Sequence, residues 1–250
     1  MKTATTIDEV IVILDTIIST SEKNQDPLGY FAVLYRKVTL KVKEGIAEGF
    51  FDDNPRMERF DVVFANRYIE AYMAYQNKEA ITHSWERAFA LSKKYWPIVL
   101  QHLLIGMNAH INLDLGITAA QISKGKPIED LKDDFDKINT ILSSLVNEVQ
   151  QDLAAIWPTL KKLLQWSKKA DDFLIDFSMN LARDGAWKFA TTLAGKDPAT
   201  IDTLIQERDH KVADKAKIIT NPGMIARLIL GIIRIGERGS VAVKIDKLKN

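Results

Sequence analysis

The fold class is decided by the stretch from Leu131 to Val149, which reads LKDDFDKINTILSSLVNEV. Its apolar side chains recur every three or four positions, at Leu131, Phe135, Ile138, Ile141, Leu142, Leu145 and Val149. This is the period of one face of an α-helix, whereas a half-buried strand would alternate at every second residue. The same spacing recurs from Ile7 to Ile18 and through most of the chain. We therefore expect an all-α protein.

Prolines divide the 250-residue chain into segments of helix length. They stand at positions 27, 55, 97, 127, 158, 198 and 222, and four of them directly follow Asp or Asn, as is typical of helix starts. No linker rich in Gly, Ser or Pro separates the segments. We expect one domain over residues 1–250, a bundle of nine to ten helices. Their predicted ranges are 6–21, 28–49, 55–76, 81–94, 97–119, 127–156, 158–167, 170–195, 198–217 and 222–238.

Composition excludes several functional classes. The chain has 34 Lys and Arg against 33 Asp and Glu, so it lacks the basic excess of a dedicated nucleic-acid binder. The absence of Cys excludes disulfides, thiolate metal sites and a thiol nucleophile. The sequence contains none of the G-x-G-x-x-G, G-x-x-x-x-G-K-[ST], G-x-S-x-G or H-E-x-x-H motifs. Nucleotide enzymes, serine hydrolases and zinc proteases of these types are therefore not indicated.

The sequence predicts neither a secretory signal nor a transmembrane helix. Asp8 and Glu9 stand where a signal peptide would be basic, and no stretch of 18 uncharged apolar residues exists. We therefore expect a cytoplasmic protein. The segment from Met224 to Arg238 places three arginines in one stripe beside a broad apolar surface. Such a helix could lie on an anionic membrane, but the breadth of its apolar surface favours packing into the bundle.

Polar chemistry is concentrated in residues 101–116, which read QHLLIGMNAHINLDLG. Half of these residues are strongly apolar, so the helix is expected to be buried on nearly all sides. At about 100° per residue, one face carries His102, Gly106, His110 and Asp114, and the opposite face carries Gln101, Asn108 and Asn112. Gly106 allows another element to approach the helix backbone. We expect the polar side chains to be buried and bonded to one another, to water or to a ligand.

His110 and Asp114 are four residues apart and therefore stack on one helix face. This spacing suits a structural pair, a carboxylate that orients an imidazole for acid–base work, or two ligands of a shared metal ion. If Asp114 is a structural partner, Asp114→Asn should cost about 1–3 kcal/mol of stability. If Asp114 instead orients His110 in a working site, the substitution should leave the melting temperature unchanged or raise it.

Two other segments could supply partners for this pair. Asp61 shares a helix face with Tyr68 and Tyr72, and either points inward with them or is an exposed acid near the helix start. The second segment carries a polar stripe that contains Asp172, Asp176, Asn180, Arg183 and Trp187. Either this stripe is a solvated face, or its Arg183 pairs with a carboxylate such as Asp114 or Asp61. The acids Asp133, Asp134 and Asp136, and Asp171, Asp172 and Asp176, do not have the D-D-x-x-D spacing of prenyl-diphosphate enzymes. We expect both clusters to be solvated.

Several segments together resemble an uncharacterised bacterial family, domain of unknown function 5995. The resemblance is carried by GMNAHINLDL at 106–115, QHLL at 101–104, GYFA-x-LYR at 29–36, RFD-x-VFANRY at 59–68 and FS-x-x-x-ARD-x-AW at 177–187. It covers most of the chain and implies an all-helical, single-domain protein. It implies no reaction, so the function must be argued from the residues.

Two functional hypotheses follow from these residues. In the first, the protein is a hydrolase-like or lyase-like enzyme that acts on a small organic substrate, and a divalent metal could assist the reaction. Its proposed catalytic residues are His110, Asp114, Asp61 and His102, and its proposed binding residues are Asn108, Asn112, Arg67, Arg183 and Trp187. In the second, the protein is a non-enzymatic helical protein whose polar stripes hold a ligand or only fix the packing.

Overall fold

The computed structural model describes residues 2–157 and 179–249, and every regular element in these ranges is a helix. The all-α prediction is confirmed, although the described part alone contains eleven α-helices. They are α1 (Ile7–Asn24), α2 (Leu28–Ala47), α3 (Asn54–Gln76), α4 (His83–Ala90), α5 (Val99–Ala109), α6 (Leu115–Ile122), α7 (Lys132–Ile156), α10 (Met179–Leu193), α11 (Pro198–Thr220), α12 (Met224–Gly236) and α13 (Val241–Lys249). The predicted helix 158–167 and the start of 170–195 lie outside the described residues.

Three features of the helix pattern differ from the prediction. The predicted helix 97–119 is α5 and α6 joined by one π-helical segment, His110–Asp114. The predicted helix 127–156 begins with a 3₁₀ turn, Ile128–Leu131, before α7. Helix α13 was not predicted, although Ile245 and Leu248 are buried at helical spacing. The periodicity of side chains locates helices, but it does not reveal a local change in the backbone hydrogen-bond pattern.

Acidic side chains from remote parts of the chain accept hydrogen bonds from backbone N–H groups at three helix starts. Asp134 of α7 accepts hydrogen bonds from the backbone N–H groups of Asp52 (2.6 Å) and Asp53 (3.1 Å), just before α3. Asp209 of α11 caps α4 in the same way, and Glu237 accepts from the N–H of Val99 at the start of α5 (2.8 Å). Because free N–H groups make a helix start electropositive, these carboxylates fix the angles between helices as well as their ends. Asp134 is fully buried, so the prediction of a solvated acid cluster was wrong for this residue.

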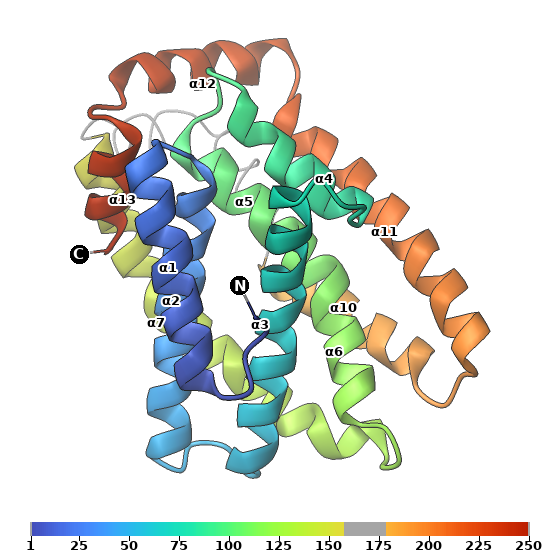
Figure 1. Cartoon of the computed structure of the whole chain (residues 1–250). Helices are drawn as coiled ribbons and strands as arrows, with labels where there is room; N and C mark the ends of the chain where they lie inside the picture. Colours follow the sequence, from blue (N-terminus) through green and yellow to red (C-terminus); the bar gives the residue numbers. More distant parts are fainter. Residues whose placement is uncertain (1, 158–178, 250) are drawn as a thin grey trace.

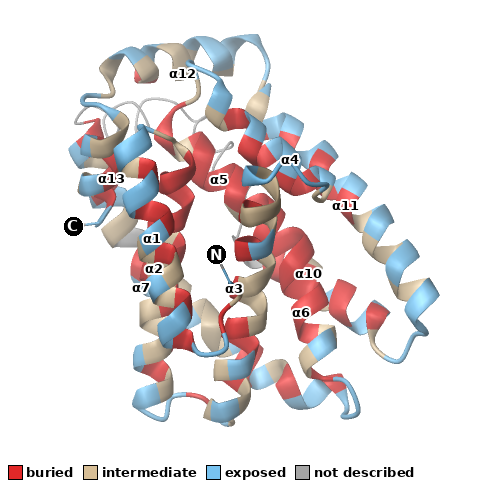
Figure 2. Cartoon of the chain, viewed as in Figure 1, coloured by how far each residue is buried: buried red, intermediate tan, exposed pale blue. Residues whose placement is uncertain are grey.

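The rod formed by α5, the π segment and α6 is the centre of the molecule (Figure 1). Helices α2 and α3 pack on it from one side, α4 and α11 from another, and α10 lies against α6. In Figure 2 the rod is buried along most of its length. Gly106 permits the close approach that the sequence predicted, because a Cβ there would lie 2.5 Å from the Phe31 ring of α2.

Helix α12 packs on the bundle, as the sequence predicts, but through one face only. It runs across one end of the assembly (Figure 1), and Ile233 is its one fully buried residue. Met224, Leu228 and Ile235 are exposed to 85%, 68% and 80%. The described residues contain no single helix long and apolar enough to cross a membrane. Helices α11 and α12 meet the length and composition requirement only as a pair, and that pair is bent by 66°.

Candidate functional site

One polar stripe of the central rod faces α11, and none of its buried side-chain atoms is without a hydrogen-bond partner. We call Gln101, Asn108 and Asn112 the α11-facing stripe. The Gln101 side chain donates to the carbonyl of Ile219 (2.7 Å) and accepts from the N–H of Ile98 (3.1 Å). Asn108 donates to the carbonyl of Val212 (3.0 Å), and Asn112 donates to Asn108 (3.2 Å). These bonds attach the rod to α11, and the two asparagines have a structural role.

The opposite stripe faces α3 and consists of His110, Asp114 and Thr118. Its centre is Asp114, which is 1% exposed and accepts three hydrogen bonds. Arg67 Nε of α3 lies 2.7 Å from Oδ1, while Trp85 Nε1 of α4 and His110 Nδ1 lie 2.9 and 3.1 Å from Oδ2. Asp114 therefore joins α3, α4 and the central rod through one carboxylate.

The π-helical segment runs from His110 to Asp114 and contains both members of this pair. A π turn widens the helix locally, and such turns are frequent at functional sites. The pair predicted from the spacing of four residues is thus present, together with the predicted burial of His110, Asp114, Asn108 and Asn112.

The electrostatic environment keeps Asp114 ionised and His110 neutral. Burial alone would raise the pKa of Asp114, but the Arg67 charge and the bonds from His110 and Arg67 outweigh it and lower the pKa. Burial lowers the pKa of His110 despite the neighbouring carboxylate. A neutral imidazole that donates through Nδ1 has an unprotonated Nε2. His110 is therefore a potential proton acceptor at Nε2.

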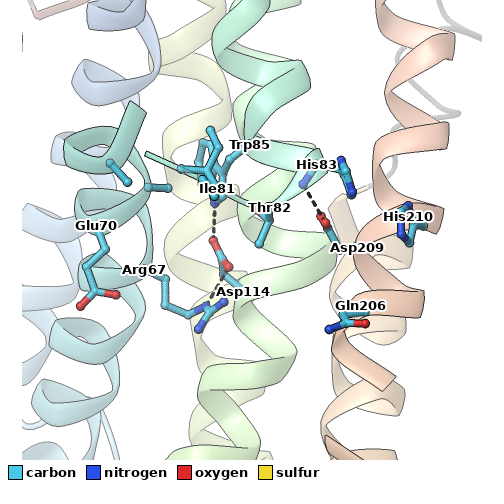
Figure 3. Close-up of a pocket in the computed structure, with 13 residues that line it drawn as sticks. Arg67, Glu70, Ile81, Thr82, His83, Trp85, Asp114, Gln206, Asp209 and His210 are labelled. Carbon is cyan, nitrogen blue, oxygen red and sulfur yellow. Dashed lines mark hydrogen bonds and ion pairs between the residues drawn. The ribbon is translucent and has the colours of Figure 1, made fainter. Parts of the chain in front are cut away.

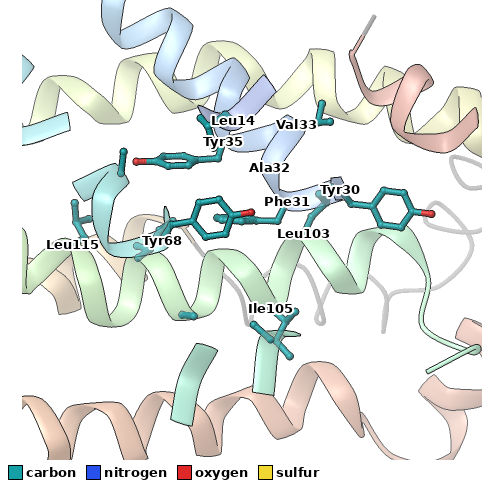
Figure 4. Close-up of a cluster of buried hydrophobic side chains, with 14 of the residues drawn as sticks. Leu14, Tyr30, Phe31, Ala32, Val33, Tyr35, Tyr68, Leu103, Ile105 and Leu115 are labelled. Atoms are coloured by element: carbon teal, nitrogen blue, oxygen red, sulfur yellow. The ribbon is translucent and has the colours of Figure 1, made fainter. Parts of the chain in front are cut away.

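Aromatic rings enclose this imidazole. The Phe64 ring of α3 stacks on it with centroids 3.7 Å apart and planes 6° apart, and the Tyr35 ring meets it edge-on at 4.6 Å. His110 Nε2 and the hydroxyl groups of Tyr35 and Tyr68 are buried without a hydrogen-bond partner among the described residues. In Figure 4 the Tyr35 hydroxyl points towards the Leu115 end of the rod and the Tyr68 hydroxyl points the opposite way. Unpaired buried polar atoms are costly, so they mark a region that is not optimised for stability alone.

Asp61 belongs to the same buried region. It is 5% exposed, which supports the inward orientation that the sequence left open, and its Oδ2 atom also has no partner among the described residues. Burial, with a smaller effect from Glu58, raises the pKa of Asp61 to about 7. The charge of Asp61 in turn contributes to the raised pKa of Tyr35, behind the effect of burial.

A pocket of about 570 Å³ opens on the outer side of Asp114 (Figure 3). We call it the Arg67 pocket. It lies between α3, the segment before α4, and α11, and its lining includes Arg67, Glu70, Thr82, His83, Trp85, Asp114, Gln206, Asp209 and His210. The rings of His83 and His210 stack 4.5 Å apart on one wall. His110 does not line the pocket, so Asp114 is the link between the open space and the buried imidazole.

Comparison with protein-family models assigns the chain to a family. The model of the family of unknown function DUF5995 matches residues 7–222, which include all the residues lining the Arg67 pocket. The chain belongs to DUF5995. No curated protein and no solved structure gave a significant match.

The DUF5995 fold does not bring all the predicted site residues together. His102 packs edge-on against Tyr30 two turns before His110, and burial, with Arg234 and Lys244, lowers its pKa to about 3. Arg183 pairs with neither Asp114 nor Asp61, since it donates to the carbonyl of Phe135 and stacks on that ring at 4.4 Å. Trp187 also packs on Phe135. Asp171, Asp172, Asp176 and the side chain of Asn180 lie outside the described part of the DUF5995 chain.

The metal interpretation gains no support from the residues that the structure describes. These contain no group of three or more His, Cys, Asp or Glu side chains placed to bind one ion. Sequence reasoning also missed several pocket residues, among them Trp85, His83 and His210. These come from α4 and α11, more than a hundred residues apart in the chain, and no local motif connects them.

Proposed function

We propose that this protein binds a small organic anion in the Arg67 pocket. One observation carries the proposal. Arg67 donates to Asp114 through Nε, and the terminal nitrogens of its guanidinium make no hydrogen bond with any described residue. An arginine fixed in this way presents its remaining N–H groups as a fork that suits a carboxylate or phosphate.

The other polar groups of the pocket support an acceptor-rich ligand. The two buried acids are already engaged, Asp114 by three side chains and Asp209 by the N–H groups of His83 and Ser84. Glu70 is exposed, and Figure 3 shows it across Arg67 from the His83 and His210 wall. The groups left to meet a ligand near that wall are therefore the His210 imidazole, Nε2 of His83 and the Gln206 amide, since Nδ1 of His83 lies 3.5 Å from Glu86. A volume of about 570 Å³ lies within the range of small-molecule sites.

Catalysis is the second candidate, favoured by the unpartnered Nε2 of His110. Asp114 orients the imidazole by accepting from Nδ1, as a carboxylate does for a general base. A hydrolase-like or lyase-like reaction on a small substrate would use Nε2 as the proton acceptor. Because His110 is enclosed by rings and lies behind Asp114, this reaction requires the pocket to open towards α3 before proton transfer.

A ligand panel tests the binding proposal. The panel contains carboxylates, phosphates and their neutral and cationic analogues, and binding is measured by thermal shift and then by calorimetric titration. We expect the protein to bind the anions in preference to the other compounds. Arg67→Lys keeps a charge opposite Asp114 but removes the fork, so affinity should fall about tenfold. His210→Ala should also weaken binding. Lys211→Ala, an exposed neighbour on α11 that does not line the pocket, is the control and should change nothing.

Two results would separate the candidates. Selection of cations, or equal affinity of the Arg67→Lys variant, would contradict the proposed anion site. Conversion of a bound anion, detected by mass spectrometry and lost in His110→Gln with affinity retained, would establish the enzymatic candidate. A bound anion that remains intact in both proteins would favour the non-enzymatic role.

A further inference from the structure

Helix α12 has two apolar faces, and only one of them is covered. Ile229, Leu230 and Ile233 pack towards the rest of the molecule. The other face is exposed and consists of Met224 (85%), Ile225 (54%), Leu228 (68%), Ile232 (53%) and Ile235 (80%). At about 100° per residue these five side chains fall within an arc of about 100°, so they form one continuous stripe. We call it the outer stripe of α12.

An exposed apolar stripe of this size is a binding surface rather than ordinary surface variation. Single exposed apolar residues are common on proteins, whereas a contiguous set marks a site of interaction. Figure 2 shows the exposed side of α12 running across the end of the molecule, where no described helix covers it. The helix begins at Met224, two residues beyond the segment matched by the family, so the surface is not part of that match.

The surroundings of the outer stripe are basic and aromatic. Arg227 and Arg234 fall in an adjacent narrow arc of the helix, Arg238 is exposed two residues beyond its end, and α12 itself contains no acidic residue. Arg234 donates to the carbonyl of Tyr95 (2.8 Å) and lies 4.7 Å from the centre of its ring. Tyr95 and the adjoining Trp96 are themselves 73% and 62% exposed. Arginine beside exposed aromatic and aliphatic side chains is the composition of helices that lie in the headgroup region of a bilayer.

We infer that the outer stripe of α12 docks this protein on an anionic lipid bilayer. The helix would lie in the plane of the surface, with the outer stripe among the acyl chains and Arg227 among the headgroup phosphates. With 13 residues it is too short to span the bilayer. A second copy of the chain fits less well, because α12 offers no carboxylate to the arginines of another α12. The nearby Glu237 is already paired with Lys244 at 2.7 Å, and both side chains are buried.

Vesicle co-sedimentation of the full chain tests this inference. The probes are vesicles of phosphatidylcholine alone and of equal parts phosphatidylcholine and phosphatidylglycerol. The protein should bind the mixed vesicles, bind neutral vesicles more weakly, and lose the difference in high salt. Leu228→Glu should weaken binding to mixed vesicles by about tenfold or more, since it removes one deeply inserted side chain. Arg227→Gln should weaken it by about fivefold and reduce the preference for anionic lipid.

Val12→Glu provides the matched control. Val12 is 64% exposed on α1, so the substitution places the same charge at an equally exposed apolar position away from α12. It should leave vesicle binding unchanged, and circular dichroism should show all variants folded. Absence of binding to mixed vesicles would overturn the inference. So would a dimer, measured by light scattering, that Leu228→Glu dissociates while vesicle binding stays at background, because the surface would then be a self-association site.

Discussion

The two polar stripes of the central rod lie on the same helix, are equally buried and are bonded very differently. The α11-facing stripe, Gln101, Asn108 and Asn112, finds its partners in backbone carbonyls and in its own members. The α3-facing stripe concentrates three donors on Asp114 and leaves His110 Nε2 and the Thr118 hydroxyl without partners among the described residues. A stripe without an unpaired buried atom is explained by folding. A stripe with unpaired atoms behind an open pocket indicates selection for something besides stability.

The largest expected effect is at Asp114. Asp114→Ala leaves the Arg67 guanidinium, the Trp85 indole N–H and the His110 imidazole without their common acceptor. We expect a loss of about 3–5 kcal/mol in the free energy of unfolding, measured in urea, because one partner of a buried ion pair is removed. Asp130→Ala, at an exposed acid, is the control. An Asp114→Asn variant at least as stable as the parent would instead support the sequence-based alternative, in which Asp114 orients His110 in a working site.

The second effect is a pH dependence caused by Asp61. Its pKa is about 7 in the folded protein and about 3.8 when unfolded, so the folded state binds the proton more tightly between these values. Stability should therefore fall as pH rises from about 4 to 7. Asp61→Asn removes this penalty and should be about 2–4 kcal/mol more stable than the parent at pH 8, with little difference at pH 4. Urea unfolding of both proteins across this range measures it, and a constant difference would contradict it.

Asn108 tests the α11-facing stripe. Asn108→Ala leaves the carbonyl of Val212 and the amide of Asn112 without partners, so we expect a loss of about 1–3 kcal/mol. Affinity for an anion in the Arg67 pocket should not change, because Asn108 lies on the opposite side of the rod. If affinity falls while stability is retained, the two stripes are not functionally separate.

The smallest effect is at Thr118. Its hydroxyl is buried without a partner, so Thr118→Val should leave the melting temperature unchanged or raise stability by up to about 1 kcal/mol. Thr39 is an equally buried control on α2, whose hydroxyl donates to the Tyr35 carbonyl at 3.0 Å. Thr39→Val should therefore destabilise. Equal losses at both positions would show that water or another group satisfies Thr118, and would weaken the contrast between the stripes.

Several parts of the site could be predicted because they depend on spacing along one helix. The interval of four residues places His110 beside Asp114, and the apolar neighbours predict that both are buried. Gly106 was predicted to admit another element, and the Phe31 ring occupies that place. The π turn could not be predicted, because it changes the backbone bonds without changing the pattern of side chains.

The hydrogen-bond partners that other helices supply to Asp114 could not be predicted from the sequence. The sequence offered Arg183 as a partner for Asp114 or Asp61, yet Arg183 packs on Phe135 and Arg67 is the arginine that reaches Asp114. Trp85, which donates to Asp114, stands in a short helix whose sequence contains no polar motif. Which cation reaches a buried carboxylate depends on how helices are rotated about their axes and on where they cross. Those variables are determined by packing along the whole molecule.

The sequence by itself determined that the chain is helical, which helix is buried on all sides, and which polar residues share each of its faces. These properties follow from the fixed period of the α-helix and from the cost of exposing apolar side chains. Tertiary structure alone decided that Arg67 and Trp85 meet Asp114, that α4 and α11 form a pocket beside it, and that the outer stripe of α12 faces outward. The physical reason is that these contacts join residues far apart in the chain, and their geometry is determined by the packing of whole helices rather than by any local run of residues.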